Sequence, residues 1–256
     1  MDSTARRIAA MAVMLMMLMM IAVVAAQAAP AGAKAKPSPS RATTAASSLP
    51  SKPPLGAVIL FDGKNLDNWR HPWGEPATWQ VRDGATTTGR GNIISERTFT
   101  DAYIHVEFRE PYVPEARGQE RGNSGVYIQG RYEIQVLDSY GFKAPGKGDC
   151  GAIYDQFAPL VNACKPPLEW QTYDIIFRAA RVDPSGKVTE RARITLLQNG
   201  MVIHNNVETL GPTAGGNANV GEPGPLLLQA HGSNVQYRNI WLVPLPLKGS
   251  DTYAPQ

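Results

Sequence analysis

The chain has 256 residues, a formal net charge of +3 and two cysteines. Part of the positive charge comes from basic residues near the N-terminus, which leaves the rest of the chain close to neutral: Arg6, Arg7, Lys34, Lys36, Arg41 and Lys52. A nucleic-acid-binding domain needs a concentrated basic surface. The composition therefore argues against nucleic acid as a partner.

The N-terminus has the features of an export signal. Arg6 and Arg7 precede an uncharged apolar run at 8–26, and AQA at 26–28 supplies a small-x-small cleavage pattern. We therefore expect residues 1–28 to be a signal peptide and the protein to be exported to the periplasm or the extracellular space. Because the apolar run is long enough to span a bilayer, an uncleaved N-terminal membrane anchor stays open as the alternative.

Two regions follow the predicted signal. Residues 29–55 are mainly Ala, Pro, Ser, Thr and Lys, and they cannot bury enough apolar surface to offset the entropy of ordering. We expect a flexible tether there. Residues 56–250 are long enough for one well-buried domain, and we expect a single domain. The sequence gives no indication of the oligomeric state.

The signals for secondary structure in this domain are nearly all β. Nine short segments are rich in β-branched and aromatic residues and are separated by Gly, Pro, Asn and Asp: 77–81, 103–109, 124–129, 132–138, 171–181, 191–200, 201–207, 225–232 and 235–243. Asn199-Gly200 lies between two of them and is a strong hairpin signal, and DPSGK at 183–187 predicts another turn. The pattern predicts an all-β fold, an antiparallel jelly-roll β-sandwich.

The stretch GNSGVYIQGRYEIQVLDSYG at 122–141 predicts a hairpin with one polar face. For the apolar residues of both strands to share a face, Gln129 is expected opposite Glu133 and Tyr127 opposite Gln135. This register requires a three-residue loop at 130–132. The polar face would then be rich in carboxylate, amide and aromatic groups.

Such a face suits a saccharide, whose hydroxyl groups need hydrogen bonds and whose C–H faces stack on aromatic rings. We therefore expect it to form the floor of a saccharide groove. The alternative from the residues alone is an ordinary solvated sheet face, which is also polar.

The two cysteines, Cys150 and Cys164, are close enough in sequence to close a short loop. In an oxidising compartment a disulfide between them would stabilise the fold by about 3 kcal/mol. The alternative is two unrelated buried thiols. No metal ligand set is evident, so no cofactor is certain, although a divalent cation such as Ca²⁺ stays open.

Six ordered blocks between about 56 and 246 resemble a known family. They are FDGKNLDNW, W-x-V-x-D-G, GNSGVYIQGRYEIQVLDSYG, CGAIYDQFAPLVNACKPPLEWQTYDI, LQNG and LLLQAHGSNVQYRNIWLVPL. This domain looks like a member of the 3-keto-disaccharide hydrolase family. The resemblance implies a concanavalin A-like, laminarinase-like jelly roll and an exported bacterial enzyme that acts on oxidised glycosides.

The chemistry implied by this resemblance begins with removal of an acidic proton. A ketone at C3 acidifies the C2 proton, so a base can form an enolate that expels the group at C1, and addition of water completes net hydrolysis. We expect Glu133 to be the base and His231 to be the acid or the donor to the enolate. The expected saccharide contacts are Asn123, Tyr127, Gln129, Arg131, Gln135, Asp138, Tyr154 and Gln229.

Each of the main candidates also has a structural interpretation. Glu133 could be a solvated strand residue or could pair with Arg131 or Arg109, which contributes little at a surface. His231 precedes a glycine and could serve a turn, and Asp138 in DSYG has the composition of a turn residue.

Two other functions remain open at this level. A conventional glycosidase on the same fold would need a second carboxylate about 5 to 5.5 Å from Glu133 for retention, and the dense acidic strand of laminarinase-like enzymes is interrupted here by Gln135 and Asp138. A non-catalytic, lectin-like saccharide-binding module is the other alternative, because a fold does not fix a function.

Overall fold

The computed structural model describes residues 51–248. The predicted signal peptide, its candidate membrane span and nearly all of the predicted tether lie outside these residues. Within residues 51–248, no helix is long and apolar enough to cross a membrane.

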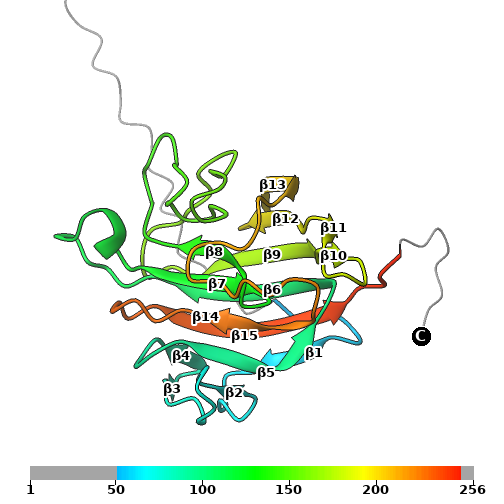
Figure 1. Ribbon diagram of the computed structural model, residues 1–256. Helices are drawn as coiled ribbons and strands as arrows, with labels where there is room; N and C mark the ends of the chain where they lie inside the picture. Colours follow the sequence, from blue (N-terminus) through cyan, green and yellow to red (C-terminus); the bar gives the residue numbers. More distant parts are fainter. Residues whose placement is uncertain (1–50, 249–256) are drawn as a thin grey trace, which may run out of the picture. The chain divides into compact units, whose positions relative to one another are not determined.

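The described chain folds into a sandwich of two antiparallel sheets (Figure 1). The eight-stranded sheet has the order β13-β12-β9-β6-β15-β4-β3, with β1 also paired to β15. Its strands are β1 (Val58–Phe61), β3 (Gln80–Arg82), β4 (Ala85–Thr87), β6 (Ala102–Arg109), β9 (Gln171–Arg178), β12 (Arg193–Gln198), β13 (Met201–Glu208) and β15 (Gln236–Pro244).

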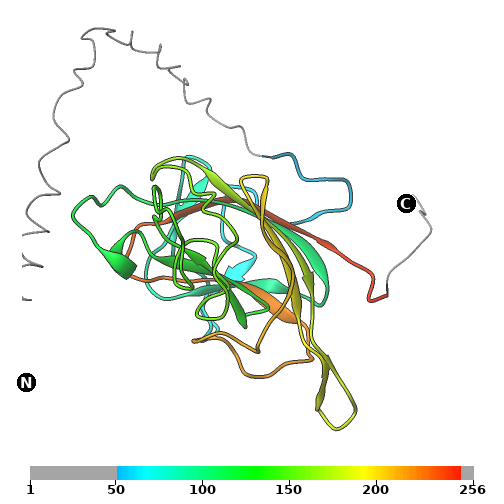
Figure 2. The same ribbon diagram turned by 90° about the horizontal axis from the view of Figure 1, so that it is seen from above.

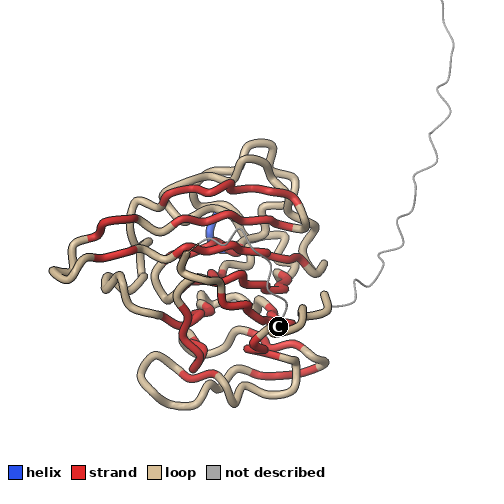
Figure 3. Tube along the Cα trace, turned by 90° about the vertical axis from the view of Figure 1, so that its right-hand side faces the viewer, coloured by secondary structure: helices blue, strands red, loops and turns tan. Residues whose placement is uncertain are grey.

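The five-stranded sheet has the order β2-β5-β14-β7-β8. Its strands are β2 (Trp69–Arg70), β5 (Ile93–Phe99), β7 (Ser124–Ile128), β8 (Tyr132–Val136) and β14 (Gly224–Leu228). A short hairpin of β10 (Arg181–Val182) and β11 (Val188–Glu190) projects from one end of the sandwich (Figure 2). The one helical element of the described residues is the 3-10 turn η1 (Gly118–Glu120), shown in blue in Figure 3.

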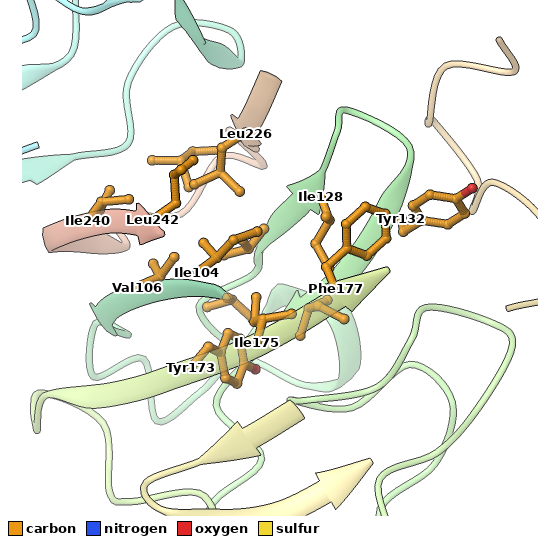
Figure 4. Close-up of a cluster of buried hydrophobic side chains, with 14 of the residues drawn as sticks. Ile104, Val106, Ile128, Tyr132, Tyr173, Ile175, Phe177, Leu226, Ile240 and Leu242 are labelled. Carbon is orange, nitrogen blue, oxygen red and sulfur yellow. The ribbon is translucent and has the colours of Figure 1, made fainter. Parts of the chain in front are cut away.

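The core lies between the two sheets. In Figure 4, Ile128 of β7 and Tyr132 of β8 meet Phe177 of β9, and Leu226 of β14 faces Leu242 of β15. These side chains are fully or almost fully buried because they lie on the faces of their strands that point into the sandwich. The predicted all-β jelly-roll sandwich is confirmed.

Each of the nine expected strand segments overlaps a strand, and both predicted turns are present. Asn199 and Gly200 have φ values of 53° and 80° and join β12 to β13, as two-residue hairpin loops require. Strand β5 was not predicted, because Ser95, Glu96 and Arg97 interrupt the apolar alternation of its sequence.

Candidate active site

The predicted hairpin exists, but its predicted register is wrong. Tyr127 lies opposite Glu133 and Ile128 opposite Tyr132, so the loop is Gln129 to Arg131 rather than 130–132. The reason is that Tyr132 belongs to the core, where it packs on Phe177 with ring centroids 5.6 Å apart. A shift of two residues leaves each side chain on its original face, so the polar face keeps its composition.

Tyr127, Glu133 and Gln135 of this polar face line a concave site. Every residue of β7 and β8 is nevertheless buried. Residues 151–154 run along the free edge of β8, where Gln135 N donates to Ala152 O over 3.0 Å and Tyr154 N donates to Glu133 O over 3.1 Å. At the hairpin turn, Thr213 N donates to Arg131 O over 2.9 Å. Two loops therefore convert an exposed face into a lined pocket.

The pocket has a volume of about 270 Å³. It is lined by Gln119, Asn123, Tyr127, Glu133, Gln135, Tyr154, Ala214, Gly215, Gln229 and His231. Seven of the predicted site residues are therefore brought together: Asn123, Tyr127, Glu133, Gln135, Tyr154, Gln229 and His231. They come from β7, from β8, from the residues following β14, and from two loops.

Glu133 lies on β8 and is only 3 % exposed. Its Oε2 accepts a hydrogen bond from the Tyr127 hydroxyl over 2.8 Å, and its backbone N donates to Thr213 Oγ1 over 2.9 Å. The opposing strand makes room for the carboxylate, because a Cβ atom at Gly125 would overlap with Glu133 Oε1. Gly125 thus has a steric role that explains a glycine in the middle of a strand.

Burial raises the pKa of Glu133 to about 7, while the hydrogen bond from Tyr127 acts in the opposite direction. Among the described residues, no cation forms an ion pair with this carboxylate. Burial also raises the pKa of Tyr127 well above its usual range, so its hydroxyl remains a donor. A carboxyl group with a pKa near neutrality suits a general base.

Amide side chains occupy much of the remaining lining. Gln135 lies within 2.8 Å of Gln119 and, with its amide nitrogen turned toward Glu133, donates to Glu133 Oε1 over 3.2 Å. Gln229 Nε2 donates to the Tyr127 hydroxyl over 3.1 Å, while Gln229 Oε1 is buried and has no hydrogen-bond partner among residues 51–248. His231 is exposed at the mouth. The lining can donate and accept several hydrogen bonds without adding charge beside Glu133.

Three predicted saccharide contacts do not line the pocket. Gln129 turns away from it and donates to Phe99 O over 2.8 Å, because its backbone has a φ of 56° in the loop. Arg131 instead donates to Gln129 Oε1 and to Glu222 O and so holds the loop after β13. Asp138 forms a 2.5 Å ion pair with Arg121. All three have structural partners, and their prediction as contacts is corrected.

Cys150 and Cys164 are free thiols in the structure, so the expected disulfide is not present in it. Both Sγ atoms lie 3.4 Å from Gln198 Nε2, and Cys150 Sγ also lies 3.2 Å from the Tyr173 hydroxyl. The two thiols are therefore near neighbours rather than unrelated residues. A disulfide between Cys150 and Cys164 stays a prediction.

Sequence reasoning missed four residues that shape the pocket. Gln119 lies in η1 and contacts Asn123 and Gln135, while Ala214 and Gly215 belong to a long loop. Neither segment has a periodic pattern that would place it over a sheet. Of the four, only Gly125 could have been predicted from the sequence, because a glycine within a strand often marks a position where another group approaches the backbone closely.

No group of three or more His, Cys, Asp or Glu side chains within residues 51–248 is arranged to hold a metal ion.

The structure is thus that of a β-sandwich domain with a polar pocket built around one buried carboxylate. The sequence model of the 3-keto-alpha-glucoside-1,2-lyase-like domain matches residues 56–243, and the chain belongs to this family. The resemblance inferred from the six sequence blocks is thus confirmed. A comparison with curated proteins gave no match.

Solved structures agree with this assignment. A candidate glycosyl hydrolase from Parabacteroides distasonis is 37 % identical to this chain, with a TM-score of 0.70, over 75 % of this chain and 84 % of that one. A second candidate glycosyl hydrolase from the same organism is 22 % identical, with a TM-score of 0.52, over 74 % of this chain and 99 % of that one. The second match supports the fold alone.

Proposed function

We propose that this protein is an exported enzyme that cleaves 3-keto-glycosides, including 3-keto-disaccharides, by elimination across C1–C2 followed by addition of water. The observation that carries the proposal is Glu133, a buried carboxylate with a pKa of about 7 and no ion-pair partner among the described residues. Family membership and the 37 % identical candidate glycosyl hydrolase support the wider class of reaction.

In the first step Glu133 removes the proton from C2 of the bound keto sugar. The electron pair of the C–H bond moves into the C2–C3 bond and gives an enolate at the C3 oxygen. Neutral donors stabilise such an oxygen best when they are already in place. The amide groups of Gln119 and Asn123 are in the lining and are suitable donors.

In the second step the enolate reforms the ketone and expels the C1 oxygen, which leaves a C1=C2 double bond. His231, which is exposed at the mouth of the pocket, gives a proton to the departing oxygen. Water then adds its oxygen to C1 and gives its proton to His231, which restores the acid, while Glu133 returns its proton to C2. The net reaction is hydrolysis, and Glu133 ends in its original protonation state.

The lining also favours this reaction over the two alternatives. Glu133 is the one carboxylate among the described residues that line the pocket, whereas a conventional retaining glycosidase needs two. A lectin site would have no need of a carboxyl group with its pKa raised to about 7.

The proposal is tested by incubating the purified protein with a 3-keto-disaccharide and with its unoxidised parent. Release of free sugar is followed with and without a chelator. We expect cleavage of the keto sugar alone. Equal cleavage of both sugars would support a conventional glycosidase, and binding without cleavage would support a lectin; either result overturns the proposal.

A further inference from the structure

The pocket is too small for a complete disaccharide. Its volume of about 270 Å³ lies just below the usual range for small-molecule sites, about 300–1,000 Å³. It therefore suits one sugar ring, and the leaving group must lie outside it.

The walls of the pocket show where the leaving group can extend. Tyr154 closes the side beyond β8, and Ala214 and Gly215 close the side at the hairpin turn. Gln119 closes the opposite end through its contacts with Asn123 and Gln135. The remaining direction runs over β14 toward β5 and β2, on the side of His231.

A continuous lateral row of paired residues runs in this direction. Glu133 pairs with Tyr127, Tyr127 with Leu227, Leu227 with Ile94, and Ile94 with Arg70. Directly paired residues point to the same face of a sheet, so all five side chains lie on the outer face. At about 4.8 Å per strand, Leu227 lies about 10 Å and Arg70 about 19 Å from Glu133 along the row.

The chemistry of the row changes with distance from the pocket. Leu227 and Ile94 are apolar and only half-buried, so they offer a surface for the C–H face of a ring. Arg70 is exposed, and its guanidinium has no hydrogen-bond or ion-pair partner among the described residues. An apolar stretch that ends in an unpaired cation fits a ring with oxygen acceptors on its far edge.

An aromatic ring lies at the same end of the sheet as His231. Trp73 stacks on His71 with centroids 4.3 Å apart and planes 4° from parallel, and its Nε1 donates to Glu75 over 2.9 Å. Trp73 remains 53 % exposed, because only one face covers His71. The Trp73 ring lies next to Gly91. Asn92, which follows Gly91, accepts a hydrogen bond from Ala230 N over 3.0 Å, and Ala230 lies between the pocket residues Gln229 and His231.

We propose that Leu227, Ile94, Arg70 and Trp73 form a subsite for the leaving group. It takes a ring-shaped leaving group, either a second sugar or an aromatic group, and favours one with a carboxylate near Arg70. The subsite rests on the proposed function in one respect, because it assumes that the keto sugar occupies the pocket.

Binding to Glu133→Gln protein, which keeps the substrate intact, tests this subsite. Dissociation constants are measured for a 3-keto-disaccharide and for the methyl 3-keto-glycoside, which lacks the second ring. Adding Trp73→Ala should weaken disaccharide binding about 10-fold, the upper range for one aromatic contact, and leave the methyl glycoside within about 2-fold. Ile176→Ala, on the outer face of the other sheet and 45 % exposed, is the control and should change neither.

The role of Arg70 is tested with aryl 3-keto-glycosides that differ by one carboxylate on the aryl ring. Arg70→Gln should remove the preference for the charged compound, and Arg82→Gln, an exposed arginine on β3, should keep it. For Trp73→Ala, equal losses of affinity for the methyl 3-keto-glycoside and the 3-keto-disaccharide, or no loss of affinity for either, would overturn the subsite.

The same titrations with the unoxidised disaccharide and its methyl glycoside require no turnover. Suppose that Trp73→Ala weakens binding of the unoxidised disaccharide but not of its methyl glycoside, while the wild-type protein cleaves no keto sugar. That result would overturn the proposed function and retain the subsite. Cleavage of the keto sugar without a ring-dependent loss would retain the function and overturn the subsite.

Discussion

Glu133 and Glu107 are buried carboxylates on the outer faces of the two sheets, and their pKa values move in opposite directions. Glu133 is 3 % exposed and burial raises its pKa to about 7. Glu107 is 2 % exposed, and burial alone would raise its pKa as well, but hydrogen bonds from His105, Asn239, Ser51 and Arg238 lower it to about 2. Nearly equal burial thus gives a carboxyl group with a low pKa in one sheet and a carboxyl group with a pKa near 7 in the other.

The difference lies in the partners. Arg238 Nε is 2.6 Å from Glu107 Oε2, and Asn239 and the Ser51 backbone also donate to the carboxylate. The Glu133 carboxylate instead accepts hydrogen bonds from two neutral groups, the Tyr127 hydroxyl and the Gln135 amide. A carboxylate without a compensating cation is costly to bury, so its retention in a lined pocket indicates function rather than stability.

Replacing Glu133 should affect turnover more than any other change. Glu133→Gln removes the base but keeps the shape of the side chain, so turnover of the 3-keto-disaccharide should fall by about 10²–10⁴-fold, with substrate binding retained. Single-turnover kinetics and calorimetric titration measure the two quantities. Retention of most of the activity would show that Glu133 is not the base.

The second effect is on stability. Replacement of Glu107 by Gln should lower the unfolding free energy above neutral pH, whereas replacement of Glu133 by Gln should raise it. Glu107→Gln deprives Arg238 of a buried counter-charge and should cost about 3 kcal/mol of unfolding free energy at pH 7. Because the folded pKa of Glu107 is lowered, its stabilisation is present above about pH 4.5 and is lost as the pH falls toward 2.

For Glu133 the folded pKa is raised, so its carboxyl group stabilises the fold below about pH 4.5 and this contribution is lost as the pH rises through 7. Glu133→Gln should therefore be more stable than the wild type at pH 8, by roughly 2–3 kcal/mol, and similar at pH 4. Denaturant unfolding at pH 4 and 8 measures both variants. A loss of stability at pH 8 in Glu133→Gln would contradict the comparison.

The third effect concerns the space that Gly125 leaves for the carboxylate. Gly125→Ala places a Cβ where Glu133 Oε1 lies, and the displaced base should lower kcat by about 10–100-fold, as a misplacement near 1 Å can. Gly146→Ala is the matched control, because its Cβ would meet Asp149 Oδ2 at an ordinary 3.4 Å. If both variants have wild-type kcat, the position of Glu133 does not depend on Gly125.

The smallest effect is a shift in pH dependence. The Tyr127 hydroxyl holds the pKa of Glu133 below the value that burial alone would give. Tyr127→Phe should therefore move the midpoint of the rise in kcat/KM to higher pH. Tyr112→Phe, at an exposed tyrosine, should not move it. A downward shift in Tyr127→Phe would contradict the assigned hydrogen bond.

The sequence predicted the sandwich well because alternation and turn residues report local structure directly. It could not fix the hairpin register, since Tyr132 as a loop residue and Tyr132 as a core residue give the same polar face. It also could not separate Arg131 and Asp138 from the pocket residues, because their partners, Glu222 and Arg121, lie on other segments. Gln119 could not be predicted as a site residue, because it lies in a loop region without a periodic sequence pattern.

Glu133 can serve as the proposed base only if its carboxyl group titrates near neutral pH. Selective ¹³C labelling of glutamate side chains, with Glu133→Gln to assign the signal, allows its carboxyl group to be titrated by NMR without any substrate. We predict a midpoint near pH 7 for Glu133. A midpoint below pH 5 would show that the carboxylate is ordinary, and it would contradict this account of the site.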